Sequence, residues 1–421
     1  MNNFRNHILV IFLLVFLFLN SSCSLLLKEA YDENNNRINL LPQPKTRVYC
    51  KAQESKVELL GPDKKNGEEF LKFLKSNEKM PEAEIFTLWI LLHLNLRPEK
   101  VSLPSHVKFF ESQFQNIEFR EFNSGQTPLL FALNDLLKRH HSKQTVEKLD
   151  QFLKKNYRHH LYVDDDFEKF LETKKEVLWS FKELRDSLFK DNQPLKAGET
   201  LSFIKTAFNP SSKGDPIALA QNLSSQKSFF CDHDQSLYSG PHEKIMTTDE
   251  NVPKPLLLGL KISDHLFFMI IDQELKIGTE NSGLFHANGI APTKNTPFCF
   301  FPLEKSQLIL TASHIRDPEQ ILKLISHKID KNFSTKEEIA LLLSYPRQLT
   351  LTHPTRILIE ADNTRLSQSK DKDLENLFKG QYPIYQANQL GLVNAIFIEN
   401  TQKESGIVTD KRFRQTINCF K

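Results

Sequence analysis

Glycine is scarce in this sequence, and the motifs that depend on it are missing. The chain has 13 glycines in 421 residues, which is about 3% against a usual value near 7%. It contains no Walker loop, no dinucleotide-binding glycine fingerprint, no His-Glu-x-x-His and no Gly-x-Ser-x-Gly. The sequence therefore offers no motif for a nucleotide-binding protein, a zinc protease or an α/β-hydrolase.

The sequence also has no large excess of basic or acidic residues. The chain has 55 basic and 52 acidic residues, which leave a formal net charge of +3 at pH 7. A protein that binds nucleic acid needs a basic face that neutralises phosphates. We therefore expect no nucleic-acid partner.

The apolar run near the N-terminus is too short to cross a membrane. It extends over 12 residues, from Ile8 to Leu19, and a helix of that length rises about 18 Å against a hydrocarbon core of about 30 Å. Arg5 precedes the run, and the small residues of an Asn-Ser-Ser-Cys sequence follow it and end at Cys23. This layout is typical of a cleaved export signal, so we predict a signal peptide over residues 1–22.

The position of Cys23 resembles the lipobox of bacterial lipoproteins, whose cysteine becomes the lipidated first residue of the mature protein. The resemblance implies a palmitate-type anchor at Cys23, with the membrane as a partner through that anchor. Ser24, rather than aspartate, follows the anchor, which is similar to lipoproteins sorted to the outer membrane of diderm bacteria. We expect an exported protein of the cell envelope, anchored at the outer membrane and facing the periplasm or the cell surface.

Four cysteines remain beyond the anchor: Cys50, Cys231, Cys299 and Cys419. An even number in an exported chain predicts two disulfides, and four cysteines allow three connectivities. We favour Cys231–Cys299, because both residues lie in one β-rich region. Cys50–Cys419 would then join the two ends of the mature chain.

Composition and periodicity divide the mature chain into three parts. Residues 23–65 are polar and irregular and are expected to form the anchor and a tether. Residues 66–222 show helical periodicity, including an 81–94 segment that is apolar almost all round and predicts a buried helix. Residues 223–421 contain short apolar runs between turn residues, which are typical of antiparallel strands. The predicted fold class is α+β, with an N-terminal all-helical domain followed by a mainly antiparallel α+β domain.

The region 226–300 holds the candidate catalytic residues. A thiol nucleophile needs a thiolate paired with an imidazole, and the candidates are Cys231 with His233, His265 and His286. Cys299 is the alternative thiol. Against this hypothesis, an exported cysteine is more often bridged than catalytic.

A metal site in the same region would use Asp232, His233 and His242. Carboxylate and imidazole ligands bind zinc together, but these residues lack any recognised ligand spacing. We favour a polar loop here, and we expect no metal and no cofactor.

Two functions remain open. We favour a lipid-anchored envelope protein without catalytic activity that binds or scaffolds an unidentified ligand, with another envelope protein as a candidate partner. The alternative is an exported hydrolase with its site in the 226–300 region.

Overall fold

The computed structural model divides into two compact units. One comprises Thr46–Tyr345 with Gly391–Lys421, and the other comprises Met1–Lys45 with Pro346–Leu390. The structure describes residues 48–51, 56–77, 79–96, 106–122, 128–157, 162–163, 165–173, 175–180, 185–186, 188–200, 217, 219–232, 255–272, 276–277, 290–291, 296–313, 318–345, 347–352, 355–360, 384–387, 390–400, 405–410, 412 and 416–420.

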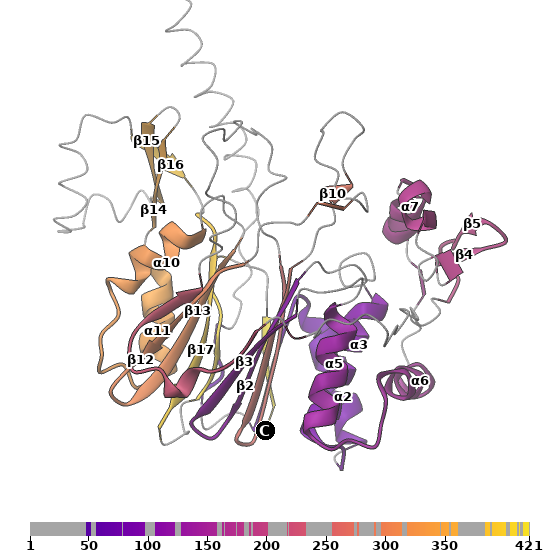
Figure 1. Cartoon of the computed structure of the whole chain (residues 1–421), viewed down its shortest axis with the longest axis horizontal. Helices are drawn as coiled ribbons and strands as arrows, with labels where there is room; N and C mark the ends of the chain where they lie inside the picture. The colour runs from indigo at the N-terminus through magenta and orange to yellow at the C-terminus, as the bar shows by residue number, and fades with distance from the viewer. Residues whose placement is uncertain are drawn as a thin grey trace, which may run out of the picture. The chain divides into compact units, whose positions relative to one another are not determined.

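The larger unit is built on two sheets (Figure 1). The seven-stranded sheet has the order β19-β1-β8-β9-β2-β3-β6, and the five-stranded sheet has the order β18-β17-β13-β12-β7; every pairing in both is antiparallel. The strands of the first sheet are β19 (Thr416–Phe420), β1 (Val57–Gly61), β8 (Leu256–Ile262), β9 (His265–Asp272), β2 (His106–Gln113), β3 (Asn116–Phe122) and β6 (Leu219–Asn222). Those of the second are β18 (Gly406–Val408), β17 (Leu392–Glu399), β13 (Ser306–Ser313), β12 (Phe298–Pro302) and β7 (Phe230–Asp232).

Helices cover the outer face of each sheet, so the unit has four layers, helix–sheet–sheet–helix. The seven-stranded sheet is covered by α2 (Lys64–Lys75), α3 (Glu82–Leu96) and α5 (Pro128–Arg139), and α6 (Val146–Asn156) packs on α3. The five-stranded sheet is covered by α10 (Pro318–Ser326) and α11 (Lys336–Ser344). This arrangement leaves the inner faces of the two sheets in contact with each other.

Strand β9 shows why the central sequences are apolar at consecutive positions. Phe267, Met269 and Ile271 pack in the core under the helices, whereas Phe268 and Ile270 pack in the core between the sheets. Side chains alternate between the faces of a strand, and both faces of β9 are buried. A continuous apolar run is the expected result.

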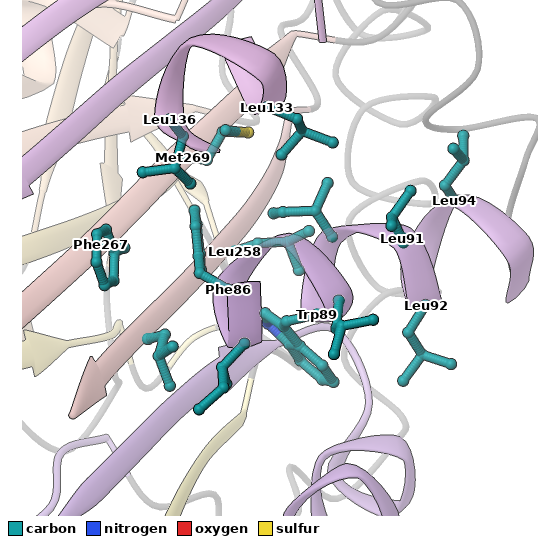
Figure 2. Packing of buried hydrophobic residues seen from close by; sticks show 14 of the residues in the cluster. Phe86, Trp89, Leu91, Leu92, Leu94, Leu133, Leu136, Leu258, Phe267 and Met269 are labelled. Carbon is teal, nitrogen blue, oxygen red and sulfur yellow. The ribbon is translucent and has the colours of Figure 1, made fainter. Parts of the chain in front are cut away.

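Helix α3 is buried all round, as its sequence predicts. Every residue from Ala83 to Asn95 is buried, and Figure 2 shows Phe86 and Trp89 packed among side chains of α5, β8 and β9. The Trp89 indole Nε1 donates to the Leu60 carbonyl at 2.9 Å. A side chain at Gly61 would overlap with the same indole, so this position is restricted to glycine.

The predicted all-helical N-terminal domain is wrong. Within the predicted helical range of residues 66–222, strands β2, β3 and β6 belong to the same sheet as β8 and β9. Strand β1, inside the range 23–65 predicted as anchor and tether, is also part of that sheet. The error arises because β2 is buried along almost its whole length, including its charged residues Lys108 and Glu111. Their partners come from distant parts of the chain and are invisible to local periodicity.

Helix α11 begins with a capping box formed by Thr335 and Glu338. Thr335 caps α11, and the Glu338 carboxylate accepts from the Thr335 backbone N–H at 2.9 Å in the reciprocal contact. These contacts lower the pKa of Glu338: burial alone would raise it, but the hydrogen bonds from Ser334 and Thr335 outweigh that effect.

The described residues also form several smaller parts. A small apolar cluster joins α7 (Asp165–Thr173), α8 (Lys175–Ser180) and the short pair β4 (Phe189–Lys190) and β5 (Gln193–Pro194). A further strand pair links β10 (Lys276–Ile277) and β11 (Ile290–Ala291), and η1 (Leu223–Ser225) follows β6. In the smaller unit, β15 (Thr355–Glu360) pairs antiparallel with β14 (Gln348–Thr352) and parallel with β16 (Ile384–Ala387).

Candidate functional site

A polar cluster lies between the two sheets, at the end where β9 stops and β12 starts. His106 and Lys108 come from β2, Glu121 comes from β3, and Asp272 is the last residue of β9. Thr296 lies just before β12 in the other sheet. On β2 and β9 these positions share the alternation of Phe110 and Ile270, which face the core between the sheets. We call these five residues the β9-end cluster.

Thr296 is held by each of its polar groups. Its hydroxyl donates to Asp272 Oδ1 at 2.5 Å, and its backbone N–H lies 3.2 Å from both oxygens of that carboxylate. Its carbonyl accepts from Lys108 Nζ at 2.8 Å. Thr296 has no exposed surface, and Lys108 and Asp272 are 1% and 2% exposed. The hydroxyl and the carboxylate are therefore paired away from bulk water.

His106 lies between two carboxylates. Its Nε2 is 2.5 Å from Glu121 Oε1, and its Nδ1 is 3.7 Å from Asp272 Oδ2. Burial is the largest single influence on His106 and would lower its pKa, but the Asp272 and Glu121 carboxylates together raise the pKa above its usual value. For Glu121 burial acts in the raising direction, and the His106 contact outweighs it, so the pKa of Glu121 is lowered. Both shifts favour an imidazolium–carboxylate pair.

The cluster brings together three parts that nucleophilic catalysis uses: a hydroxyl, a proton acceptor and an orienting group. A hydroxyl is a weak nucleophile until an adjacent group accepts its proton, and that group must in turn be oriented by a third. Thr296 supplies the hydroxyl, Asp272 is the acceptor in contact with it, and His106 lies on the other side of Asp272. The arrangement is suited to acyl transfer.

All four cysteines that remain beyond Cys23 form disulfides, including the two candidate thiol nucleophiles. Cys231 and Cys299 are bonded to each other across the β7–β12 pair, and Cys50 is bonded to Cys419. Both disulfides predicted from the sequence are thus present. Neither Cys231 nor Cys299 retains a thiolate, and the Cys–His hypothesis loses its nucleophile.

His265 lies at the opposite end of β9 from Asp272. It lines a small pocket with Ser112, Lys261 and Ser263, and its ring packs near those of His140 and Phe267. It does not join the β9-end cluster. His233, His242, His286 and the side chain of Asp232 lie outside the described residues, as does Cys23. Within the described ranges no group of three or more His, Cys, Asp or Glu residues is placed to hold a metal ion.

Sequence reasoning missed Thr296, Asp272 and His106. Thr296 and Lys108 are 188 positions apart, and Thr296 and Asp272 are 24 apart. No motif spacing links them, because only the pairing of the strands brings them together. The one local signal was an aspartate that ends the apolar run of β9.

A second polar cluster lies between the sheets near the opposite end of β8. Lys336 Nζ donates to Glu58 Oε1 at 2.6 Å with both side chains fully buried, and Lys261 Nζ lies 3.8 Å from the same oxygen. The backbone N–H of Ile407 donates to Glu58 Oε2, and a side chain at Gly406 would overlap with this carboxylate. We call these residues the Glu58 cluster.

Comparison with known proteins gives no close relative. No family model matches the chain, and no curated protein matches it. Among solved structures, a structure of LmbA2991T421A is similar with a TM-score of 0.48 and 7% identity, covering 90% of this chain and 99% of that one. A cephalosporin acylase from Bacillus halodurans is similar with a TM-score of 0.45 and 8% identity, covering 91% of this chain and 100% of that one. Both TM-scores are below 0.5, so neither likeness indicates a function for this chain.

Proposed function

We propose that this protein is an exported hydrolase that forms an acyl ester on Thr296. The observation that carries the proposal is the 2.5 Å contact between the Thr296 hydroxyl and Asp272, with His106 on the far side of that carboxylate. Both Thr296 and Asp272 lie in the 226–300 region. The geometry thus favours the hydrolase alternative over a non-catalytic binding or scaffolding role, with residues other than those expected.

In the proposed reaction, Thr296 Oγ1 attacks the carbonyl carbon of an ester or amide while Asp272 accepts the hydroxyl proton. The bond to the leaving group breaks, and His106, held as the imidazolium, supplies the proton that the leaving group takes. Water then attacks the acyl ester on Thr296 and gives a proton to His106, while the proton held by Asp272 returns to Thr296 Oγ1. A carboxylic acid is released, and the hydroxyl, the Asp272 carboxylate and the His106 imidazolium are restored. The balance is one acyl bond and one water consumed, with one acid and one alcohol or amine produced.

An electrophilic probe that acylates serine and threonine hydroxyls, such as a β-lactone, tests the proposal. Peptide mass mapping should find the probe on Thr296 in the wild-type protein and no label in Thr296→Val, which keeps the shape of the side chain. The matched control is Thr311→Val, since Thr311 is also a buried threonine of the five-stranded sheet. A wild-type protein that stays unlabelled over the whole pH range of its stability would overturn the proposal. Equal labelling of Thr296→Val would do the same.

We also propose that the chain is exported and anchored by lipid at Cys23. The support is the signal layout of the first 23 residues together with two disulfides, which are typical of exported proteins. Among the residues that the structure describes, no helix is long and apolar enough to cross a membrane.

Metabolic labelling with an alkyne fatty acid tests the anchor. The wild-type protein should incorporate the label and Cys23→Ser should not. A Cys23→Ser protein that labels as strongly as wild type would exclude lipidation at this position. Fractionation of the labelled protein would then report whether the anchor lies in the outer membrane.

A further inference from the structure

Glu121 is the one member of the β9-end cluster with an appreciable solvent-exposed surface. Its side chain is 16% exposed, whereas those of His106 and Asp272 are 3% and 2% exposed. Glu121 Oε1 lies 2.5 Å from His106 Nε2, on the side of the ring away from Asp272. Thr296, Asp272, His106 and Glu121 therefore form a chain of neighbouring polar groups from a buried hydroxyl toward solvent.

The orientation of the His106 ring depends on which groups contact its two nitrogens. Its two nitrogens point in opposite directions, so a carboxylate that fixes Nε2 also fixes the direction of Nδ1. With Glu121 in place, Nδ1 faces Asp272 Oδ2. Within the cluster Glu121 contacts the His106 ring, and the ring in turn faces Asp272, so Glu121 acts through the ring.

We infer that Glu121 is the positioning residue of the site, which orients the His106 ring toward Asp272. The inference rests on the proposed function for its catalytic consequence, but the contact between Glu121 and His106 is measurable without any activity. The raised pKa of His106 and the lowered pKa of Glu121 agree with it. Lys108, also on β2, acts in the opposite sense on His106, because its charge lowers the pKa of the ring.

The first measurement is the titration of His106 in the full chain by imidazole NMR, with His106→Gln used to assign the signal. Glu121→Gln removes the charge but keeps an oxygen that accepts a hydrogen bond. His106 should then titrate at lower pH than in wild type, and Glu121→Asp should restore part of the shift. The matched control is Glu118→Gln. Glu118 lies on the same strand, is 40% exposed and pairs with Arg120 instead.

The second measurement is the pH profile of Thr296 labelling by the β-lactone. If the imidazolium donates the proton to the leaving group, labelling falls as pH rises through the pKa of His106. Glu121→Gln should move this descending limb to lower pH and slow labelling at neutral pH by on the order of 10²-fold. Glu118→Gln should leave the profile unchanged. A purely structural role for Glu121 would lower stability without moving the limb.

The outcomes separate the two proposals. An unchanged His106 titration in Glu121→Gln, in a variant that melts as wild type does, overturns the positioning role. A shifted titration with a moved labelling limb supports it. A shifted titration in a protein whose Thr296 never labels overturns the proposed hydrolase and leaves Glu121 as the residue that orients His106. If Glu121→Gln does not fold, the same comparison is made with Glu121→Asp, whose shorter side chain should lower the titration of His106 by a smaller amount.

Discussion

The two polar clusters between the sheets use buried charge in different ways. In the Glu58 cluster one carboxylate meets the fully buried ammonium of Lys336, and no hydroxyl takes part in the contacts that define it. In the β9-end cluster an imidazole lies between two carboxylates, and one of them is bonded to a threonine hydroxyl. The first arrangement joins α11 and β1 through a matched pair. The second contains an acceptor beside a nucleophilic group, and its Glu121 end reaches solvent.

The buried state of their side chains does not distinguish the two clusters. Both clusters are nearly inaccessible, and both connect elements far apart in the sequence. The clusters differ in the side chains that they bring together. In the Glu58 cluster, Lys336 and Glu58 form one close ion pair that links two elements. In the β9-end cluster, Thr296, Asp272 and His106 are successive neighbours in space, through which a proton could pass. Each cluster also lies near a disulfide. Glu58 pairs in register with Cys419, and Cys299 lies on β12, which begins just after Thr296.

Lys336→Ala should have the largest effect on stability. Removing Lys336 takes away the closer of the two ammonium groups and leaves only Lys261, at 3.8 Å, to balance the buried Glu58 carboxylate. The loss should approach the cost of breaking a buried pair, about 3–5 kcal/mol. The double variant Glu58→Leu with Lys336→Met should recover much of this loss, because it removes both charges. Urea unfolding of the two variants measures the difference. Equal stability of Lys336→Ala and wild type would mean that the pair does not join the layers.

Thr296→Val should lower stability less than Lys336→Ala does, but it should abolish acylation by the β-lactone. The substitution leaves part of a buried carboxylate without its donor, which costs about 1–3 kcal/mol. The remaining protein should fold and melt cooperatively while its labelling by the β-lactone is lost. A loss of stability larger than that of Lys336→Ala would show that the β9-end cluster, too, is chiefly a link between the sheets.

The two disulfides should differ in their effect on the unfolded chain. Cys50–Cys419 closes 369 residues and Cys231–Cys299 closes 68. In the loop-entropy model the longer loop should add about 1.5 kcal/mol more stability. Chemical unfolding of the Cys50→Ala/Cys419→Ala and Cys231→Ala/Cys299→Ala proteins tests the order. The reverse order would point to packing around each bridge as the deciding effect.

The smallest expected effect is the pH dependence that His106 confers. Its pKa in the folded protein is raised, so its contribution is complete below the unfolded value of about 6.5 and is lost as pH rises through the folded pKa. Glu121 has a lowered pKa, so its contribution is lost as pH falls below its unfolded value. Stability should therefore be highest between these two limits.

Urea unfolding across this pH range measures the effect. For one proton the slope is at most about 1.4 kcal/mol per pH unit. His106→Gln should remove the alkaline slope, and Lys336→Ala should shift the whole curve without changing it. An alkaline slope that persists in His106→Gln would assign the effect to another group.

Much of the local structure was predictable from the chain. Periodicity and flanking turn residues predict the apolar segment that forms α3. They also predict the short apolar runs that form β8, β9, β12 and β13. The strands of the first half were not predictable in this way. In β2 the charged residues Lys108 and Glu111 flank the adjacent Phe109 and Phe110, and all four are buried. Lys108 is buried with its ammonium group donating to a carbonyl 188 positions away, a partner that no local pattern shows.

From the sequence alone came the prediction of an export signal, the pairing of four cysteines into two disulfides, and the long apolar elements of the core. These features depend on residues that are close together in the chain or on a count. The tertiary structure alone decided that helices and strands of both halves form one layered unit and that Thr296, Asp272 and His106 meet. The physical reason is that pairing between antiparallel strands sets the register of residues on each face, and no local pattern records which distant strand will be the neighbour.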